Sequence, residues 1–182
     1  DAILSPAQRD GGRRPKDQVA ALYKYVPIDF STTAENLVDA AVAKLADGID
    51  IDRQMVYGLP GGGAGRRMSG HVTPVLEQEQ EIKVGRTTGG TRGFVSAIGV
   101  SVGVFMTTQG YRQQAFFSNQ IQIESESGDF SDGGDSGSVV FNEDMDAVGL
   151  IFAGARSGAR GKGKLSFANP MGLVLGALKA TL

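Results

Sequence analysis

The residues best suited to chemistry lie in the segment 133–138, GGDSGS, where Ser136 is flanked by Asp135 and Gly137. A nucleophile for acyl transfer needs an exposed hydroxyl at a tight turn, together with backbone N–H groups directed at the developing oxyanion. Glycine permits both the turn and a close approach of substrate to the backbone. The apolar residues that follow at 139–141 would anchor the turn in a core. The pattern therefore predicts a nucleophile at Ser136, with an ordinary polar loop as the alternative.

The elements that must position this turn are predicted to be mostly short strands. The candidates in the second half are 80–86, 93–98, 100–108, 114–124, 137–142, 147–153 and 164–168. Glycine, asparagine and aspartate separate them at short intervals, which favours a barrel or sandwich. Residues 18–28 also read as a strand, whereas 36–45 fits either a helix or a buried strand. Apolar spacing over 171–180 predicts a C-terminal helix.

Composition removes several classes of function. The 182 residues carry 18 basic and 20 acidic side chains, and this net charge of -2 argues against a general nucleic-acid binder. The absence of cysteine excludes a thiol nucleophile, and a single histidine excludes a multi-histidine metal site. No apolar run is long enough for a transmembrane helix. We expect no metal, no cofactor, no nucleic acid and no membrane as partners, and the compartment stays open.

Several segments together resemble the chymotrypsin-like (trypsin-like) serine peptidases. They are GDSGS at 134–138, AVGLIFAG at 147–154, LSFANP at 165–170 and VGRTTGGTRGFVS at 84–96. Two further segments, NLVDAA at 36–41 and KVGRTTG at 83–89, most resemble a divergent, disulfide-free bacterial group related to the plant narrow-leaf proteases. The resemblance covers residues 80–182 well. It implies an all-β, chymotrypsin-like double β-barrel, whose first barrel is incomplete in this chain, with a C-terminal helix.

The resemblance also implies a division of the chain and a set of catalytic roles. Residues 1–75 would hold the remainder of the first barrel and a linker, and 76–182 the second barrel. Ser136 would be the nucleophile, and the N–H groups of Gly134 and Ser136 would form the oxyanion hole. Asp39 would orient a histidine, or else be a surface carboxylate. Asp135 would be a buried carboxylate paired with a cation, which in many members is a freed N-terminus; whether Asp1 serves here is left open.

The substrate would be a peptide or protein whose side chain enters a pocket beside Ser136. The resemblance implies that Phe130, Phe152 and Gly154 line this pocket, with Phe130 near its base. An aromatic base disfavours a long basic side chain. An inward carboxylate from Asp129 or Asp132 would instead select lysine or arginine, so both possibilities remain.

The chain departs from the family pattern in its histidine. The family order is histidine, aspartate, serine, because the histidine accepts the serine proton. Here His71 follows Asp39, beyond a glycine-rich connection at 58–70, and residues 1–38 contain no histidine. We favour the reading that this is the C-terminal part of a protease, whose own N-terminal fragment would carry the histidine as a partner. The alternatives are an inactive protease-fold module that binds peptides, and recruitment of His71 in the order aspartate, histidine, serine.

Two glycine-rich stretches carry positive charge. Residues 61–67 lack the spacing of a phosphate-binding loop, so a linker is the better interpretation. Residues 154–164, GARSGARGKGK, hold four cations. We interpret them as an exposed loop beside the specificity pocket, which would favour acidic substrate residues by charge complementarity.

Overall fold

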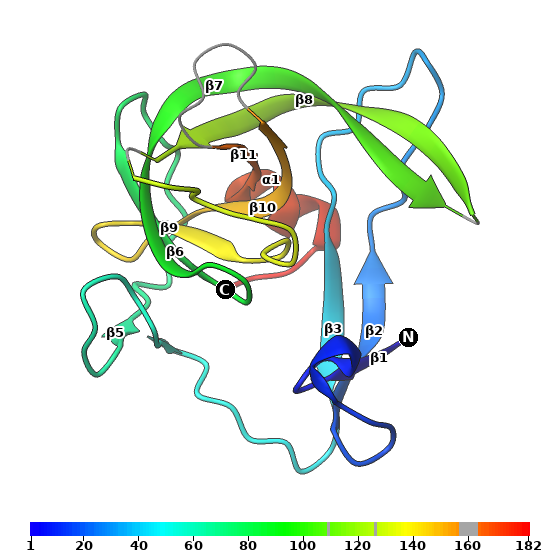
Figure 1. Cartoon of the computed structure of the whole chain (residues 1–182), viewed down its shortest axis with the longest axis vertical. Helices are drawn as coiled ribbons and strands as arrows, with labels where there is room; N and C mark the ends of the chain where they lie inside the picture. Colours follow the sequence, from blue (N-terminus) through cyan, green and yellow to red (C-terminus); the bar gives the residue numbers. More distant parts are fainter. Residues whose placement is uncertain (109, 126, 157–163) are drawn as a thin grey trace.

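Six antiparallel strands close into a barrel in the computed structural model, which describes residues 1–108, 110–125, 127–156 and 164–182 (Figure 1). The strands are β6 (Gln80–Gly85), β7 (Gly89–Thr108), β8 (Tyr111–Glu124), β9 (Val139–Asn142), β10 (Ala147–Arg156) and β11 (Lys164–Pro170). Their order around the barrel is β10, β11, β8, β7, β6, β9. Each agrees with a predicted strand position, because alternating apolar residues turn one face of every strand inward.

The barrel core is mostly apolar, with buried polar side chains on several strands, among them Gln120 of β8 and Ser166 and Asn169 of β11. Val95, Ile123 and Val140 are fully buried from three different strands. On β6, however, Glu81 and Lys83 are also fully buried, two residues apart and therefore on the same face. This charged stretch inside the barrel lies close to the turn that carries Ser136.

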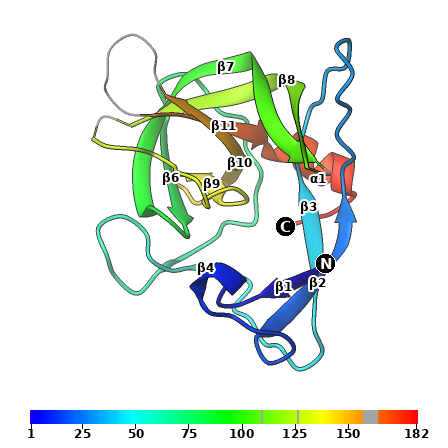
Figure 2. The ribbon, with the colours of Figure 1, turned by 45° about the vertical axis from the view of Figure 1, so that its right-hand side comes forward.

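Strand β7 differs from expectation because it is continuous. The sequence predicts two strands with a break near Gly99, but antiparallel pairing with β8 runs from Phe94 to Thr108. The pairing register shifts between Val95 and Val102, and Gly99 has a positive φ of 65°. Bulges of this kind bend a strand without ending it. The ribbon of β7 and β8 therefore curves away from the barrel (Figures 1 and 2).

The N-terminal part forms a separate three-stranded antiparallel sheet, ordered β1 (Ala2–Leu4), β2 (Gln18–Tyr25), β3 (Ala41–Leu45). A short 3-10 helix, η1 (Gln8–Asp10), follows β1. The ambiguous segment 36–45 contains a strand, not a helix. Asn36 makes an isolated parallel bridge with Phe117 of β8, which attaches this segment to the barrel.

A small hairpin occupies part of the connection between sheet and barrel. Strand β4 (Met55–Val56) pairs with β5 (Arg66–Arg67) across the glycine-rich stretch. The stretch 58–70 is therefore not purely a linker, because its last residues return to pair with β4. The division of the chain after residue 75 stays a prediction.

The C-terminal helix is confirmed as α1 (Met171–Leu178). It buries Met171, Val174 and Leu178 in a cluster that also contains Val38. Lys24 of β2 donates to the Leu178 carbonyl at 2.8 Å, which ties the N-terminal sheet to the helix end. Among the described residues, no helix is long and apolar enough to cross a lipid bilayer.

Candidate active site

The loop between β8 and β9 presents Ser136 to solvent. Internal hydrogen bonds shape it: the Asp135 amide donates to the Asp132 carbonyl, and the Ser138 amide to the Asp135 carbonyl, both at 3.0 Å. Two further bonds join Gly137 and Ser138 to Ile151 of β10, at 2.7 and 2.9 Å. The loop is therefore anchored to β10 directly after the exposed serine.

Two amides in this loop are left without an acceptor. Within the described part of the chain, neither Gly134 nor Ser136 donates its N–H to a protein group, although Gly133, Asp135 and Gly137 all do. Backbone N–H groups are normally paired unless water or a ligand takes them. An anion adjacent to Ser136 could accept from both, as an oxyanion hole requires.

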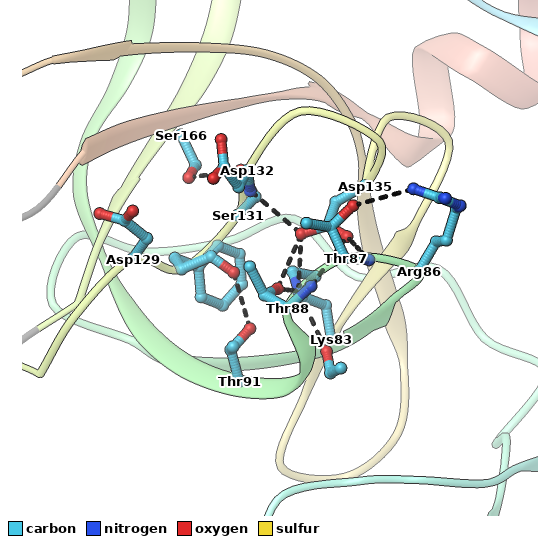
Figure 3. A network of polar contacts seen from close by, with 12 residues as sticks. Lys83, Arg86, Thr87, Thr88, Thr91, Asp129, Ser131, Asp132, Asp135 and Ser166 are labelled. Atoms are coloured by element: carbon cyan, nitrogen blue, oxygen red, sulfur yellow. Dashed lines mark hydrogen bonds and ion pairs between the residues drawn. The ribbon is translucent and has the colours of Figure 1, made fainter. Parts of the chain in front are cut away.

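A buried ion pair lies beneath the loop, as Figure 3 shows. The Asp135 carboxylate is 3.5 Å from Lys83 Nζ of β6, and both side chains are 0% exposed. Asp135 also accepts hydrogen bonds from the Thr87 amide at 2.6 Å and the Thr88 hydroxyl at 2.7 Å. Lys83 is further held by Thr88 Oγ1, at 2.5 Å, and lies 5.7 Å from the centre of the Phe130 ring. The cation expected beside Asp135 is therefore Lys83.

Among the ion pairs of the described residues, Asp135 pairs with Lys83 and none involves Asp1. Burial by itself would raise the pKa of Asp135, but hydrogen bonds from Thr88, Asp132 and Thr87 and the charge of Lys83 lower that pKa to about 2. Burial lowers the pKa of Lys83, and Asp135 opposes this effect. The pair is held as two charges, and the carboxylate stays ionised at neutral pH.

The approach of Asp135 to β6 requires glycine at position 85. A Cβ there would lie 2.4 Å from Asp135 Oδ1. The neighbouring Arg86 binds Asp10 of η1 through Nε at 2.8 Å and through Nη2, and its Nη1 lies 3.5 Å from Thr87 Oγ1. The two ion pairs differ in burial: the Lys83 and Asp135 side chains are fully buried, whereas those of Arg86 and Asp10 are each 39% exposed. The first holds the loop, and the second attaches the N-terminal segment beside it.

A cavity of about 370 Å³ opens beside Ser136. Phe152 and Gly154 of β10 line it together with Ser131 and Gly133 of the loop. Three of the residues assigned from sequence, Ser136, Phe152 and Gly154, therefore meet at one cavity. Phe152 is largely buried, and its ring lies 4.9 Å from that of Phe117.

Phe130 is the exception and needs a correction. It is fully buried in the barrel core with Val95 and Ile123 and does not line the cavity. Its position one residue before Ser131 turns its ring into the barrel toward Lys83. Ser131 lines the cavity instead, and its hydroxyl lies 2.7 Å from that of the buried Ser166.

Charged side chains from two elements line this cavity, Asp132 from the nucleophile loop and Lys164 from β11. Lys164 Nζ lies 2.8 Å from Asp132 and 3.1 Å from Asp129, whereas only Lys164 and Asp132 line the cavity. Hydrogen bonding to Asp132 and Asp129 raises the pKa of Lys164. Most of the predicted cationic loop, residues 157–163, lies outside the described residues.

Asp39 is positioned by two buried amide side chains. Its N–H donates to Asn169 Oδ1 at 3.0 Å, and Asn169 donates in turn to Gln120 Oε1 at 2.6 Å. Gln120 also donates to the Leu37 carbonyl at 2.9 Å. Asn169 pairs with Leu150 of β10, next to the Ile151 that binds the nucleophile loop. Asp39 is thus linked through Asn169 to the strand pair next to Ile151, which holds Gly137 and Ser138 of the nucleophile loop. Burial raises the pKa of Asp39.

His71 is placed elsewhere. Its carbonyl accepts from Ala147 at the start of β10, and it lines a different cavity from the two that Ser136 lines. The second cavity at Ser136, of about 510 Å³, is lined also by Gly134, Arg86 and Tyr57. Nothing in this geometry brings the histidine to the serine.

Sequence reasoning missed Lys83, Gln120 and Asn169. Because lysine and amide side chains are rarely buried, these residue types do not by themselves predict a place in the core. The available signal was position within a segment that resembles the family: Lys83 begins the segment 83–89, and Asn169 lies within 165–170.

Comparison with solved structures gives many neighbours of one fold. A chymotrypsin from Cellulomonas bogoriensis superimposes with a TM-score of 0.61 at 22% identity, covering 90% of this chain and 75% of that one. A protease described as glutamic acid specific, with a histidine triad in substrate binding, gives 0.61 at 21% identity, covering 95% and 76%. Protease A of Thermobifida fusca gives 0.58 at 16% identity, covering 84% and 72%.

Comparisons by sequence gave nothing further: no family model matched the chain, and no curated protein matched it significantly. At these identities the structural neighbours establish the fold. The closed barrel, the C-terminal helix and the neighbours agree with the all-β prediction. The chain therefore has the chymotrypsin-like double β-barrel fold of bacterial serine proteases.

Proposed function

We propose that this chain carries the nucleophile of a serine endopeptidase, which hydrolyses peptide bonds through an acyl-enzyme on Ser136. The observation that carries the proposal is the exposed Ser136 beside two uncommitted amides, in a loop held by the buried pair of Asp135 and Lys83. A substrate side chain would enter the cavity lined by Phe152 and Gly154.

The chemistry needs a base that accepts the Ser136 proton. Ser136 Oγ attacks the peptide carbonyl, and the amides of Gly134 and Ser136 receive the oxyanion. The base then passes the proton to the leaving amine, and water releases the acyl group by the same route. We assign the base to a histidine on an N-terminal segment of the same protein, with Asp39 as the carboxylate that orients it.

The described chain alone is expected to be a weak catalyst. Loss of one member of such a triad leaves only roughly 10³–10⁴-fold catalysis over water. A complete protein, or a complex with its N-terminal fragment, is expected to recover the rest.

A second candidate is a protease-fold module that binds peptides without cleaving them. The observation that favours it is the location of His71, which lines a cavity that Ser136 does not. Such a module would retain the substrate cavity and would not need the proton transfer.

Labelling with a fluorophosphonate probe, read by intact mass under denaturing conditions, separates the candidates. The probe reacts with an activated serine, and the same spectrum reveals any second polypeptide. We expect Ser136→Ala to abolish labelling and the neighbouring Ser138→Ala to retain it. Asp39→Asn is expected to slow labelling by up to ~10⁴-fold.

Each outcome selects one reading. Labelling that requires a histidine-bearing segment supports the endopeptidase. Labelling of this chain alone, abolished by His71→Ala, would contradict the external histidine and move the base to His71. If the complete protein is not labelled, the second candidate, a module that binds peptides without cleaving them, is supported.

A further inference from the structure

His71 belongs to a second cluster of polar side chains, distinct from the loop that carries Ser136. It lines a cavity of about 620 Å³ together with Arg53 and Arg67. Ser69, Gln54 and Thr181 add polar groups to the same lining. Three side chains that can carry positive charge thus share one hollow, and among the described residues no carboxylate side chain lines it.

The cations of this cavity are not neutralised by nearby acids. Among the ion pairs of the described residues, none involves Arg53, Arg67 or His71. Arg67 donates through Nη1 to the neutral Gln54 side chain, which orients the guanidinium and keeps its charge. The neighbouring Arg66 differs from Arg67, because it donates to the Glu143 carbonyl and does not line the cavity.

One carboxylate, that of Asp146, lies near His71 but is already engaged. It accepts from Thr73 Oγ1 at 2.6 Å. Hydrogen bonds from Ser69 and Thr73 lower the pKa of Asp146, and the nearby His71 ring contributes less. Among the described residues, Asp146 forms no ion pair with Arg53 or Arg67.

Apart from Gly70, the remaining lining residues have apolar side chains: Met68, Phe141, Met145, Ala147 and Leu182. Met68 follows β5, Phe141 belongs to β9, and Met145 lies in the turn after it. Phe141 and Met145 are almost fully buried, so they form a fixed surface. A ligand whose charged group binds the arginines would thus place the rest of its structure beside thioether and aromatic side chains, which suit an apolar group.

We propose that this cavity binds a small organic anion, with a phosphate or carboxylate group at Arg53 and Arg67 and an apolar or aromatic body against Met68 and Phe141. Guanidinium groups suit this role because their planar forks bind such oxyanions through paired hydrogen bonds. The site is independent of Ser136 and of the proposed peptidase activity.

The single histidine supplies a direct readout. The imidazole signals of His71 need no assignment in a proton NMR spectrum, since the chain has no other histidine. We would titrate the full chain with phenyl phosphate and, separately, with inorganic phosphate and the neutral phenol. Saturable shifts of the His71 signals are expected with phenyl phosphate, weaker ones with inorganic phosphate, and none with phenol.

Calorimetry of matched variants then tests the arginines. Arg53→Gln and Arg67→Gln should each weaken phenyl phosphate binding by about tenfold. Arg112→Gln makes the same charge change where the guanidinium stacks on Phe105 in the β7–β8 ribbon, and it should leave binding unchanged. Ser136→Ala should also bind normally. Circular dichroism melts verify that each variant is folded.

Three results would overturn the proposal. One is the absence of binding at millimolar phenyl phosphate. Another is equal affinity in wild type and in the folded Arg53→Gln and Arg67→Gln variants. The third is binding that saturates without moving the His71 signals. If inorganic phosphate bound as tightly as phenyl phosphate, the apolar part of the proposed ligand would be wrong.

Discussion

Lys83 stabilises the nucleophile loop by neutralising a carboxylate that has no access to water. Removing one member of a buried ion pair leaves the other charge uncompensated, which typically costs about 3–5 kcal/mol. We therefore expect Lys83→Met to lower the free energy of unfolding by that amount and to abolish probe labelling of Ser136. Urea denaturation and labelling measure the two effects.

The double variant Lys83→Met, Asp135→Asn is the control for this prediction. It removes both charges, so it should be more stable than Lys83→Met alone. A single variant as stable and as reactive as wild type would show that Asp135 does not need Lys83.

Asn169 is the residue on which the placement of Asp39 depends. Asn169→Leu would leave the Asp39 N–H and Gln120 Oε1 without these partners, at a cost of about 1–3 kcal/mol each. We expect lower stability in urea and slower labelling of Ser136 in the complete protein. Gln113→Leu, on the exposed hairpin, should change neither property. Unchanged labelling in a destabilised Asn169→Leu would separate Asp39 from the chemistry.

At the scale of the element, β6 carries a pH-dependent weakness. Both carboxyl oxygens of Glu81 lack a hydrogen-bond partner among the described residues. Burial, with a smaller contribution from Glu79, raises the pKa of Glu81 to about 8. Between its unfolded value near 4.5 and pH 8, the unfolded chain releases this proton and the folded chain keeps it. The free energy of unfolding therefore falls as pH rises through this window.

Glu81→Gln should remove this slope. The stability that wild type loses between about pH 4.5 and 8 is at most on the order of 5 kcal/mol. Urea denaturation at pH 5, 6.5 and 8 measures it. The exposed Glu77→Gln should keep the wild-type slope. A variant with the wild-type slope would mean that Glu81 is already ionised when buried.

Two glycine-to-alanine changes in different elements should have opposite signs. At Gly85 the new methyl would meet the Asp135 carboxylate, so β6 or the loop must shift. At Gly172 of α1 the added methyl meets nothing within 4 Å, and alanine favours a helix by about 1 kcal/mol. We expect Gly85→Ala to lower the melting temperature and Gly172→Ala to raise it slightly. A harmless Gly85→Ala would show that the loop has room to move.

At the scale of the whole molecule, the sheet and the barrel should differ in local stability. The β1–β3 sheet is open and exposes Tyr23 and Tyr25, at 73% and 60%, whereas the barrel is closed and has no free edge. Amide hydrogen exchange is therefore expected to be faster in β2 than in β8. Equal protection would indicate that both parts unfold together.

Much of the barrel could be predicted because its strands combine alternation with glycine-marked turns. The assignments of Ser136, Phe152 and Gly154 came from the family resemblance; the structure brings the three to one cavity, and their catalytic and binding roles stay predictions. Phe130 was placed wrongly, because a shift of one residue reverses the side-chain direction in an extended segment. Ser131, its neighbour, lines the cavity instead.

The buried polar residues could not be predicted in the same way. Glu81 and Lys83 alternate with Ile82 and Val84, which in an ordinary two-sided sheet would indicate a solvent-facing side. Tertiary contacts decide otherwise here, because Lys83 finds Asp135 across 52 positions of sequence. The separation of His71 from Ser136 likewise depends on the path of the β4–β5 hairpin, which a glycine-rich composition does not specify.

The internal cation at Lys83 also matters for anyone who handles this protein. Because Asp135 takes its counter-charge from Lys83 of β6, the ion pair beneath the nucleophile loop is made without Asp1. An affinity tag, a fluorescent protein or a tethered peptide fused upstream should leave that loop undisturbed. The chain could thus be joined genetically to a histidine-bearing segment, so that both halves of the candidate site are produced as one polypeptide.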